Sequence, residues 1–80
     1  MTKDNELQCY FLSFRDPDRN RNLGCCNVIV EGDLEAALSK TRDLGINPGG
    51  EVMAYRIEEP ELELNRLYSR QEMKDLDYEF

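Results

Sequence analysis

The sequence predicts a small α+β domain, built on a three-stranded, mostly antiparallel sheet with one main helix and a short C-terminal helix. Its 80 residues suffice for one domain. Apolar residues recur at strand spacing in three segments and at helix spacing in one, and turn-forming residues separate these segments. We therefore treat residues 1–80 as a single domain, with 1–7 and 77–80 expected to be mobile.

The first apolar segment, residues 8–14, predicts a strand. It is short, rich in aromatic residues and followed by turn-forming residues. Its side chains are apolar on both faces of the pleat. One face carries Cys9 and Phe11, and the other carries Tyr10, Leu12 and Phe14. Such a strand needs cover on both faces or a central place in the sheet.

A hairpin is expected to follow. Residues 15–22 are polar and predict a loop, in which Asp16 and Pro17 begin a turn. Residues 23–31 predict the second strand, because the β-branched stretch 28–30 favours the pleated conformation.

A helix is predicted over residues 34–44. Asp33 can cap its N-terminus by accepting amide hydrogens of the first turn. Gly45 suits the position after its C-terminus, with Ile46 supplying the apolar contact beyond. One apolar face is expected, formed by Leu34, Ala37, Leu38, Thr41 and Leu44.

The third strand is predicted at residues 51–57, after a tight turn at 47–50. Placing this strand antiparallel beside the first gives the sheet order 2-1-3. The first strand, apolar on both faces, then lies in the middle. The helix would cover one face of the sheet. The other face, carrying Tyr10, Leu12 and Phe14 or alternatively Cys9 and Phe11, would stay partly open.

The C-terminal region carries a weaker pattern. Ser69 and Glu72 match a capping box, which predicts a short helix over 70–76 with Met73 and Leu76 facing inward. The stretch before it predicts a loose packed segment or another short helix. Its apolar residues are Leu62, Leu64, Leu67 and Tyr68.

The charge pattern disfavours some partners. The net charge is −7, and residues 51–80 hold nine acidic and four basic residues. An acidic chain repels phosphate backbones, so we expect no direct nucleic-acid binding. No apolar run is long enough to span a membrane, and no signal peptide is visible, so we expect a cytoplasmic protein. Solubility alone would explain the acidity; attraction of a basic partner is the alternative.

No enzyme signature is present. The chain has no histidine, which removes the commonest general base and metal ligand. Cys25 and Cys26 would point to opposite faces of a strand, so they cannot readily share a metal ion. The carboxylates at 58–63 lie on a proline-broken stretch that suits a solvated loop. We therefore expect no catalytic residues, no metal site and no cofactor.

Two segments are candidate sites. The turn at 47–51 could bind a ligand through Asn47, Gly49, Gly50 and Glu51, because its glycines let backbone amides approach an anion. A plain helix-to-strand turn also explains these residues. The candidate interaction surface combines an open sheet face with three loop arginines. Its residues are Tyr10, Leu12, Phe14, Arg15, Arg19 and Arg21.

The chain also resembles a family of small uncharacterised bacterial and phage-borne proteins. The resemblance covers about residues 10–73, and its most specific part is the string Leu-Gly-Ile-Asn-Pro-Gly-Gly-Glu-Val at 44–52. It implies a bacterial or phage origin and carries over no activity and no functional residue.

Three functions remain in view. The leading hypothesis is a non-enzymatic interaction module that associates with itself, as a homodimer, or with another protein. The first alternative is an acidic inhibitor, of a kind that a phage could carry, that mimics nucleic acid or blocks a basic site on a host protein. The second alternative is an anion or nucleotide binder that uses the turn from Asn47 to Glu51.

Overall fold

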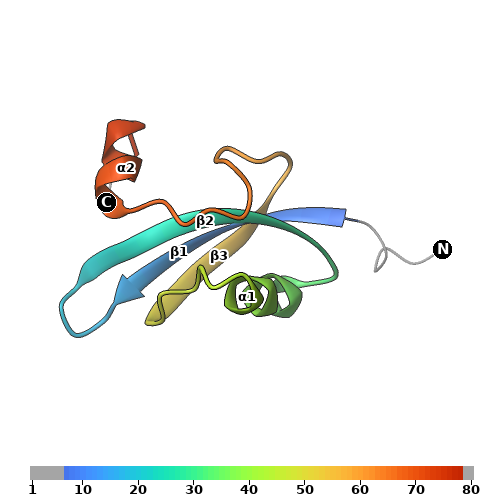
Figure 1. Cartoon of the computed structure of the whole chain (residues 1–80), viewed down its shortest axis with the longest axis horizontal. Helices are drawn as coiled ribbons and strands as arrows, with labels where there is room; N and C mark the ends of the chain where they lie inside the picture. The colour runs from blue at the N-terminus through green and yellow to red at the C-terminus, as the bar shows by residue number, and fades with distance from the viewer. Residues whose placement is uncertain (1–6, 79–80) are drawn as a thin grey trace.

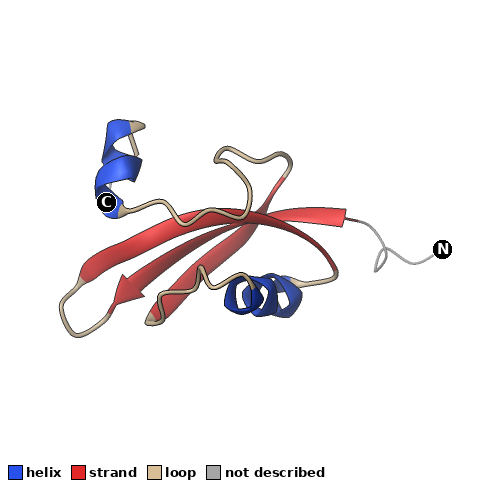
Figure 2. Cartoon of the chain, in the orientation of Figure 1, coloured by secondary structure: helices blue, strands red, loops and turns tan. Residues whose placement is uncertain are grey.

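The computed structural model describes residues 7–78, which form three strands and two helices (Figures 1 and 2). In chain order these are β1 (Leu7–Asp16), β2 (Arg21–Glu31), α1 (Leu34–Asp43), β3 (Glu51–Ile57) and α2 (Arg70–Asp75). The strands form an antiparallel sheet in the order β2-β1-β3, which confirms the predicted fold and strand order. Of the ends expected to be mobile, 1–6 and 79–80 lie outside the described residues. Leu7 begins β1, and Tyr78 packs against the core.

The hairpin is longer than predicted. Its turn is short because Asp16 Oδ1 accepts the backbone N–H groups of Asp18 and Arg19, at 3.0 and 3.3 Å. The register shifts between Phe14 and Arg15, which is the position of a β-bulge. Arg15 and Arg21 therefore belong to strands, and the predicted loop at 15–22 is corrected to a turn at 17–20.

One face of the sheet packs against α1 (Figure 1). The core on this face contains Tyr10, Leu12, Phe14, Cys26, Val28, Val30 and Ala37. The proposal that Tyr10, Leu12 and Phe14 form an exposed surface is therefore wrong for the folded chain. The alternation along β1 turns these three side chains toward α1, and all three are buried.

The predicted caps of α1 are present. Asp33 accepts the backbone N–H of Ala36 at 3.3 Å. At the other end, the N–H of Gly45 reaches the carbonyl of Arg42, and the N–H of Ile46 reaches that of Thr41. These two bonds are those of a Schellman motif, and Gly45 has the positive φ of 71° that it needs.

The apolar face of α1 is narrower than predicted. Ala37 and Thr41 are buried, whereas Leu34 and Leu44 are exposed. The two leucines lie in the first turn and at the C-cap, beyond the part of the helix that packs on the sheet.

The opposite face of the sheet is covered by the chain that follows β3 (Figure 1). We call residues 58–78 the tail. The core on this face contains Phe11, Cys25, Leu62, Tyr68 and Met73. Both faces of the central strand are thus covered, as the composition of β1 requires.

The tail binds the outer edge of β2 through two isolated bridges. Cys25 and Tyr68 exchange two backbone hydrogen bonds, of 2.9 and 2.7 Å. Two residues along β2, the buried Asn27 accepts the backbone N–H of Asn65 with its own backbone carbonyl. Its side-chain oxygen accepts those of Glu61 and Leu62, both at 2.8 Å. The segment from Leu64 to Tyr68 therefore covers part of the edge of β2.

The capping box predicted at the start of α2 is confirmed by both of its reciprocal hydrogen bonds, between Ser69 and Glu72. Met73 is buried as expected. The prediction that Leu76 faces inward is wrong. Leu76 is the C-cap residue of α2 and is 49% exposed. Neither α1 nor α2 has the length and apolar character of a membrane-spanning helix.

Candidate functional site

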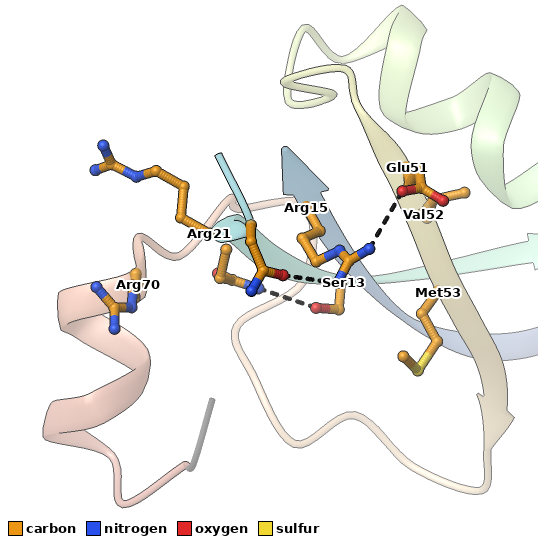
Figure 3. Close-up of a pocket in the computed structure, with 9 residues that line it drawn as sticks. Ser13, Arg15, Arg21, Glu51, Val52, Met53 and Arg70 are labelled. Atoms are coloured by element: carbon orange, nitrogen blue, oxygen red, sulfur yellow. Dashed lines mark hydrogen bonds and ion pairs between the residues drawn. The ribbon is translucent and has the colours of Figure 1, made fainter. Parts of the chain in front are cut away.

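A hollow of about 760 Å³ lies at the hairpin end of the sheet, on the face covered by the tail (Figure 3). We call it the hairpin trough. Arg70 at the start of α2 stands on one side, and β3 stands on the other. Its remaining lining comes from the hairpin and the start of β3. These residues include Ser13, Arg15, Arg21, Asn22, Glu51, Val52 and Met53.

An ion pair joins the hairpin to β3 within the trough. One terminal nitrogen of Arg15, Nη1, donates to Asn20 Oδ1 at 2.9 Å. The other, Nη2, donates to Glu51 Oε1 at 3.3 Å. Both partners of the ion pair are more than half exposed, so water screens their attraction. The pair holds the two strand ends together at a site that solvent can reach.

A small polar group lies beside this ion pair. Asn22 Nδ2 donates to Ser13 Oγ at 3.0 Å, and Asn22 Oδ1 accepts the backbone N–H of Gly24 at 2.8 Å. The buried thiol of Cys25 lies 3.9 Å from Asn22 Nδ2. Burial raises the pKa of Cys25, and hydrogen bonding to Ser13 and Asn22 only partly opposes this. The thiol is therefore neutral near pH 7 and poorly suited to act as a nucleophile.

The positive charges of this region extend into a second hollow of about 460 Å³. Arg21 and Arg70 line both hollows, and the second one adds Arg19 and Lys74. Five cationic side chains thus border the two hollows, against the carboxylates of Asp16 and Glu51. The chain as a whole holds 17 acidic and 10 basic residues, so half of its basic residues gather at this end of an acidic molecule.

The two predicted sites meet at the trough. Arg15 and Arg21 line it, Arg19 lines the neighbouring hollow, and Glu51 is the ion-pair partner of Arg15. Four further lining residues were not predicted from the sequence: Ser13, Asn22, Met53 and Arg70.

The rest of the predicted ligand-binding turn serves the fold. Asn47 Oδ1 accepts the backbone N–H of Gly49 at 2.8 Å, while Asn47 Nδ2 donates to Thr41 Oγ1 at 3.1 Å. The backbone at Gly50 packs closely on the carbonyl group of Arg15. Asn47, Gly49 and Gly50 do not line the trough, and the polar side chain of Asn47 is occupied by contacts within the chain.

The cysteines are structural. Cys25 and Cys26 lie in the cores on opposite faces of the sheet, as the strand geometry predicted. Burial raises the pKa of Cys26 to about 12. Cys9 pairs with Ile29 across the hairpin, so it does not face Cys25 or Cys26, and all three thiols are free. Within residues 7–78, no group of three potential ligands could hold a metal ion.

The outer edge of β3 is the second distinctive surface. Among the described residues, β3 pairs with β1 alone, whereas the other edge strand, β2, also carries the tail. Met53 and Tyr55 are 69% and 52% exposed on this strand, and Val52 is also exposed. Tyr55 stacks on Phe11, with ring centroids 5.4 Å apart. Side chains of this kind offer apolar contact area beside a strand edge that has no neighbour among the described residues.

Some acidic side chains of the tail form ion pairs or hydrogen bonds with other tail residues. Arg66 bridges Glu63 and Glu72, and its guanidinium also lies 4.2 Å from the centre of the Tyr68 ring. Tyr78 donates to Glu61 at 3.3 Å. Glu58 and Glu59, from the acidic stretch at 58–63, stand in an exposed loop.

A comparison of the chain with protein-family models, with curated proteins and with solved structures finds no match.

Proposed function

We propose that the protein is a non-enzymatic interaction module that associates with a second copy of itself through the outer edge of β3. The observation that carries this proposal is the contrast between the two edges of the sheet. The tail occupies the outer edge of β2, whereas within residues 7–78 no segment pairs with the outer edge of β3. Unpaired strand edges bind other strands through main-chain hydrogen bonds.

The side chains of β3 support pairing with another copy. Proteins commonly protect a free edge with proline, lysine or a bulge. The sequence of β3 contains neither residue, and its pairing with β1 is regular throughout. Its two charged side chains are engaged within the chain, since Glu51 pairs with Arg15 and Arg56 donates to Gln8 at 2.8 Å.

Symmetry gives a specific arrangement. A two-fold axis through the middle of β3 would pair Ala54 with its own copy and set Met53 opposite Tyr55. Each pair would place a flexible thioether against an aromatic ring, a favourable cross-strand contact. The two sheets would join into one sheet of six strands.

The proposal also places the protein in the cytoplasm. Three cysteines with no disulfide between them fit a reducing compartment. The alternative of an acidic inhibitor has less support, because Arg66 and Tyr78 engage acidic side chains of the tail. The basic hairpin end also interrupts the acidic surface that such an inhibitor would present.

Sedimentation velocity tests self-association. The wild-type protein is expected to move from monomer to dimer between about 10 and 500 μM, because a short edge-to-edge interface binds weakly. Met53→Lys places a charge on the edge and is expected to raise the dissociation constant at least tenfold, a change of about 1.4 kcal/mol.

The matched control is Leu44→Lys, which introduces the same charge at an exposed apolar residue of the α1 C-cap. A lysine there is compatible with the helix dipole, and dimerisation should be unchanged. A wild-type protein that stays monomeric at the highest concentration contradicts the proposal. Equal weakening by both substitutions contradicts the assignment to β3.

A further inference from the structure

The hairpin trough gathers positive charge, which the solubility of an acidic protein does not explain. Arg15, Arg21 and Arg70 come from β1, β2 and α2, so the fold brings together arginines up to 55 residues apart in the chain. Gathering like charges costs energy, and the acidic remainder of the molecule offers many carboxylates that could have paired with them. The arrangement instead leaves cationic groups facing a hollow.

Two of these arginines are available to a ligand. Arg15 already pairs with Glu51, but Arg21 and Arg70 form no ion pair with another residue of the described range 7–78. Both are exposed, and both border the two adjoining hollows. A guanidinium presents a planar set of donors that matches two oxygens of a phosphate group.

The β3 side of the trough carries an apolar side chain beside the carboxylate of Glu51. Met53 lines the trough from β3 and is among the most exposed apolar side chains of the molecule. The volume of about 760 Å³ lies in the range of small-molecule sites. The trough therefore offers cations on one side, the apolar side chain of Met53 on the other and the polar group of Ser13 and Asn22 between them.

We propose that the hairpin trough binds a small ligand that carries a phosphate chain attached to an apolar ring, as a nucleoside triphosphate does. Arg21 and Arg70 hold the phosphates, and the ring lies against Met53. This site shares Met53 with the edge of β3 in the proposed self-association, but its phosphate-binding arginines come from β2 and α2. Loss of the Arg21 and Arg70 charges therefore tests ligand binding without changing the edge of β3. The proposal moves the predicted anion-binding function from the Asn47 turn to the arginines.

Titration of the full-length protein with ATP, followed by amide NMR shifts and calorimetry, tests this proposal. We expect shifts at Ser13, Arg21, Met53 and Arg70, with no comparable shifts at Gly49. Tripolyphosphate should bind more weakly than ATP because it lacks the ring, and adenosine should bind most weakly because it lacks the charge. Affinity for ATP should fall as salt rises.

The decisive variant is the double substitution Arg21→Gln and Arg70→Gln, which keeps much of both side chains. It should weaken ATP binding at least about tenfold, because charged hydrogen bonds to phosphate are lost. Arg42→Gln, at an exposed arginine on α1, is the matched control and should leave binding unchanged. Amide spectra of each variant show whether the fold is retained.

Three results would overturn the inference. The first is no binding of ATP or tripolyphosphate at about 5 mM, a concentration at which weak sites fill. The second is undiminished ATP binding by the folded double variant. The third is equal binding of ATP and tripolyphosphate, which would remove the apolar half of the proposed ligand.

Discussion

The side-chain oxygen of Asn27 accepts the backbone N–H of Leu62 at 2.8 Å, and this buried hydrogen bond fixes the tail to the sheet. The same oxygen also accepts the N–H of Glu61. Asn27 lies in β2 and is fully buried, so no water replaces these bonds if the side chain is removed. One amide group therefore determines where the tail begins to cover the sheet.

We expect Asn27→Ala to destabilise the fold by about 2–4 kcal/mol, because two backbone donors lose their acceptor and a small cavity forms. Urea unfolding followed by circular dichroism measures this loss. Gln71→Ala, which removes an exposed amide from α2, should cost less than about 0.5 kcal/mol. A similar loss in both variants would mean that the buried bonds of Asn27 contribute little.

The two glycines of the turn before β3 give a matched pair. Both have positive φ, 89° at Gly49 and 76° at Gly50. A Cβ atom added at Gly49 would meet nothing within 4 Å, whereas one at Gly50 would overlap the backbone carbonyl of Arg15. Gly49→Ala should cost about 1–2 kcal/mol from backbone strain alone. Gly50→Ala should cost about 2–4 kcal/mol, because β3 must also move away from β1.

Urea unfolding of the two glycine variants separates strain from crowding. The difference between their unfolding free energies reports the contact with Arg15, since the backbone strain is common to both. If Gly49→Ala were as destabilising as Gly50→Ala, close packing of this turn on β1 would not be the constraint.

Because of the capping box, the free energy of unfolding should decrease as the pH falls into the acid range. The backbone N–H of Ser69, with help from the Arg66 guanidinium, holds the pKa of Glu72 below its usual value of 4.5. A carboxyl group with a lowered pKa stabilises the fold above its unfolded-state pKa, and this contribution is lost as pH falls through the folded-state pKa. Glu72→Gln should thus be less stable than wild type at pH 7, and the gap should close in acid.

Urea unfolding at several pH values from neutral to acid measures this gap. Glu59→Gln is the control, because it changes an exposed loop carboxylate outside any helix. A gap between wild type and Glu72→Gln that stays constant down to low pH would show that the charge of Glu72 is not what stabilises α2.

Cys26 should make stability depend on alkaline pH. Burial, with a smaller effect from Cys25, raises the pKa of Cys26 from 9.0 to about 12. Above pH 9 the unfolded chain ionises this thiol while the folded chain keeps it protonated, so stability declines as pH rises toward 12. Cys26→Ala should be less stable than wild type near pH 8, by about 1–2 kcal/mol, because it leaves a small cavity.

Comparing the unfolding free energies of Cys26→Ala and wild type at higher pH tests whether ionisation of the Cys26 thiol causes this loss. Between about pH 9 and 11, the unfolding free energy of Cys26→Ala should fall less steeply than that of wild type. Parallel curves for the two proteins would assign the alkaline loss to other groups.

Much of the fold follows from local sequence patterns. The β-branched stretch of β2, the Asp33 cap and the Ser69 capping box each act within a few residues, and the structure contains all three elements that they predicted. The apolar residues on both faces of β1 placed this strand in the middle of the sheet. That argument succeeded because a central strand lies beneath the cover on each face of the sheet.

The cover on the second face was not predictable in the same way. It depends on Asn27, a polar residue within an apolar strand, whose partners lie 34 and 35 residues further along the chain. Nothing local distinguishes such an asparagine from a solvated one. For the same reason the open face assigned to Tyr10, Leu12 and Phe14 was wrong, since α1 covers that face and the tail covers the other.

Only some of the residues that line the trough could be predicted from the sequence. Arg15, Arg19 and Arg21 stood out as a group because they lie within seven residues of one another. Arg70 was recognisable only as the first residue after a helix cap. Its place beside the hairpin depends on the tail crossing β2 at Cys25, a pairing that local patterns do not encode.

The tail on β2 also has a consequence for how large an assembly can become. A sheet with two bare edges can add copies at both sides and grow into a fibre. Here the strand bridges at Cys25 and Asn27 occupy part of one edge, whereas within residues 7–78 no segment pairs with the outer edge of β3. Joining two copies through β3 would use up the receptive edge of each. The same hydrogen bonds that complete the core would then act as a terminator, giving a pair of fixed size instead of a polymer.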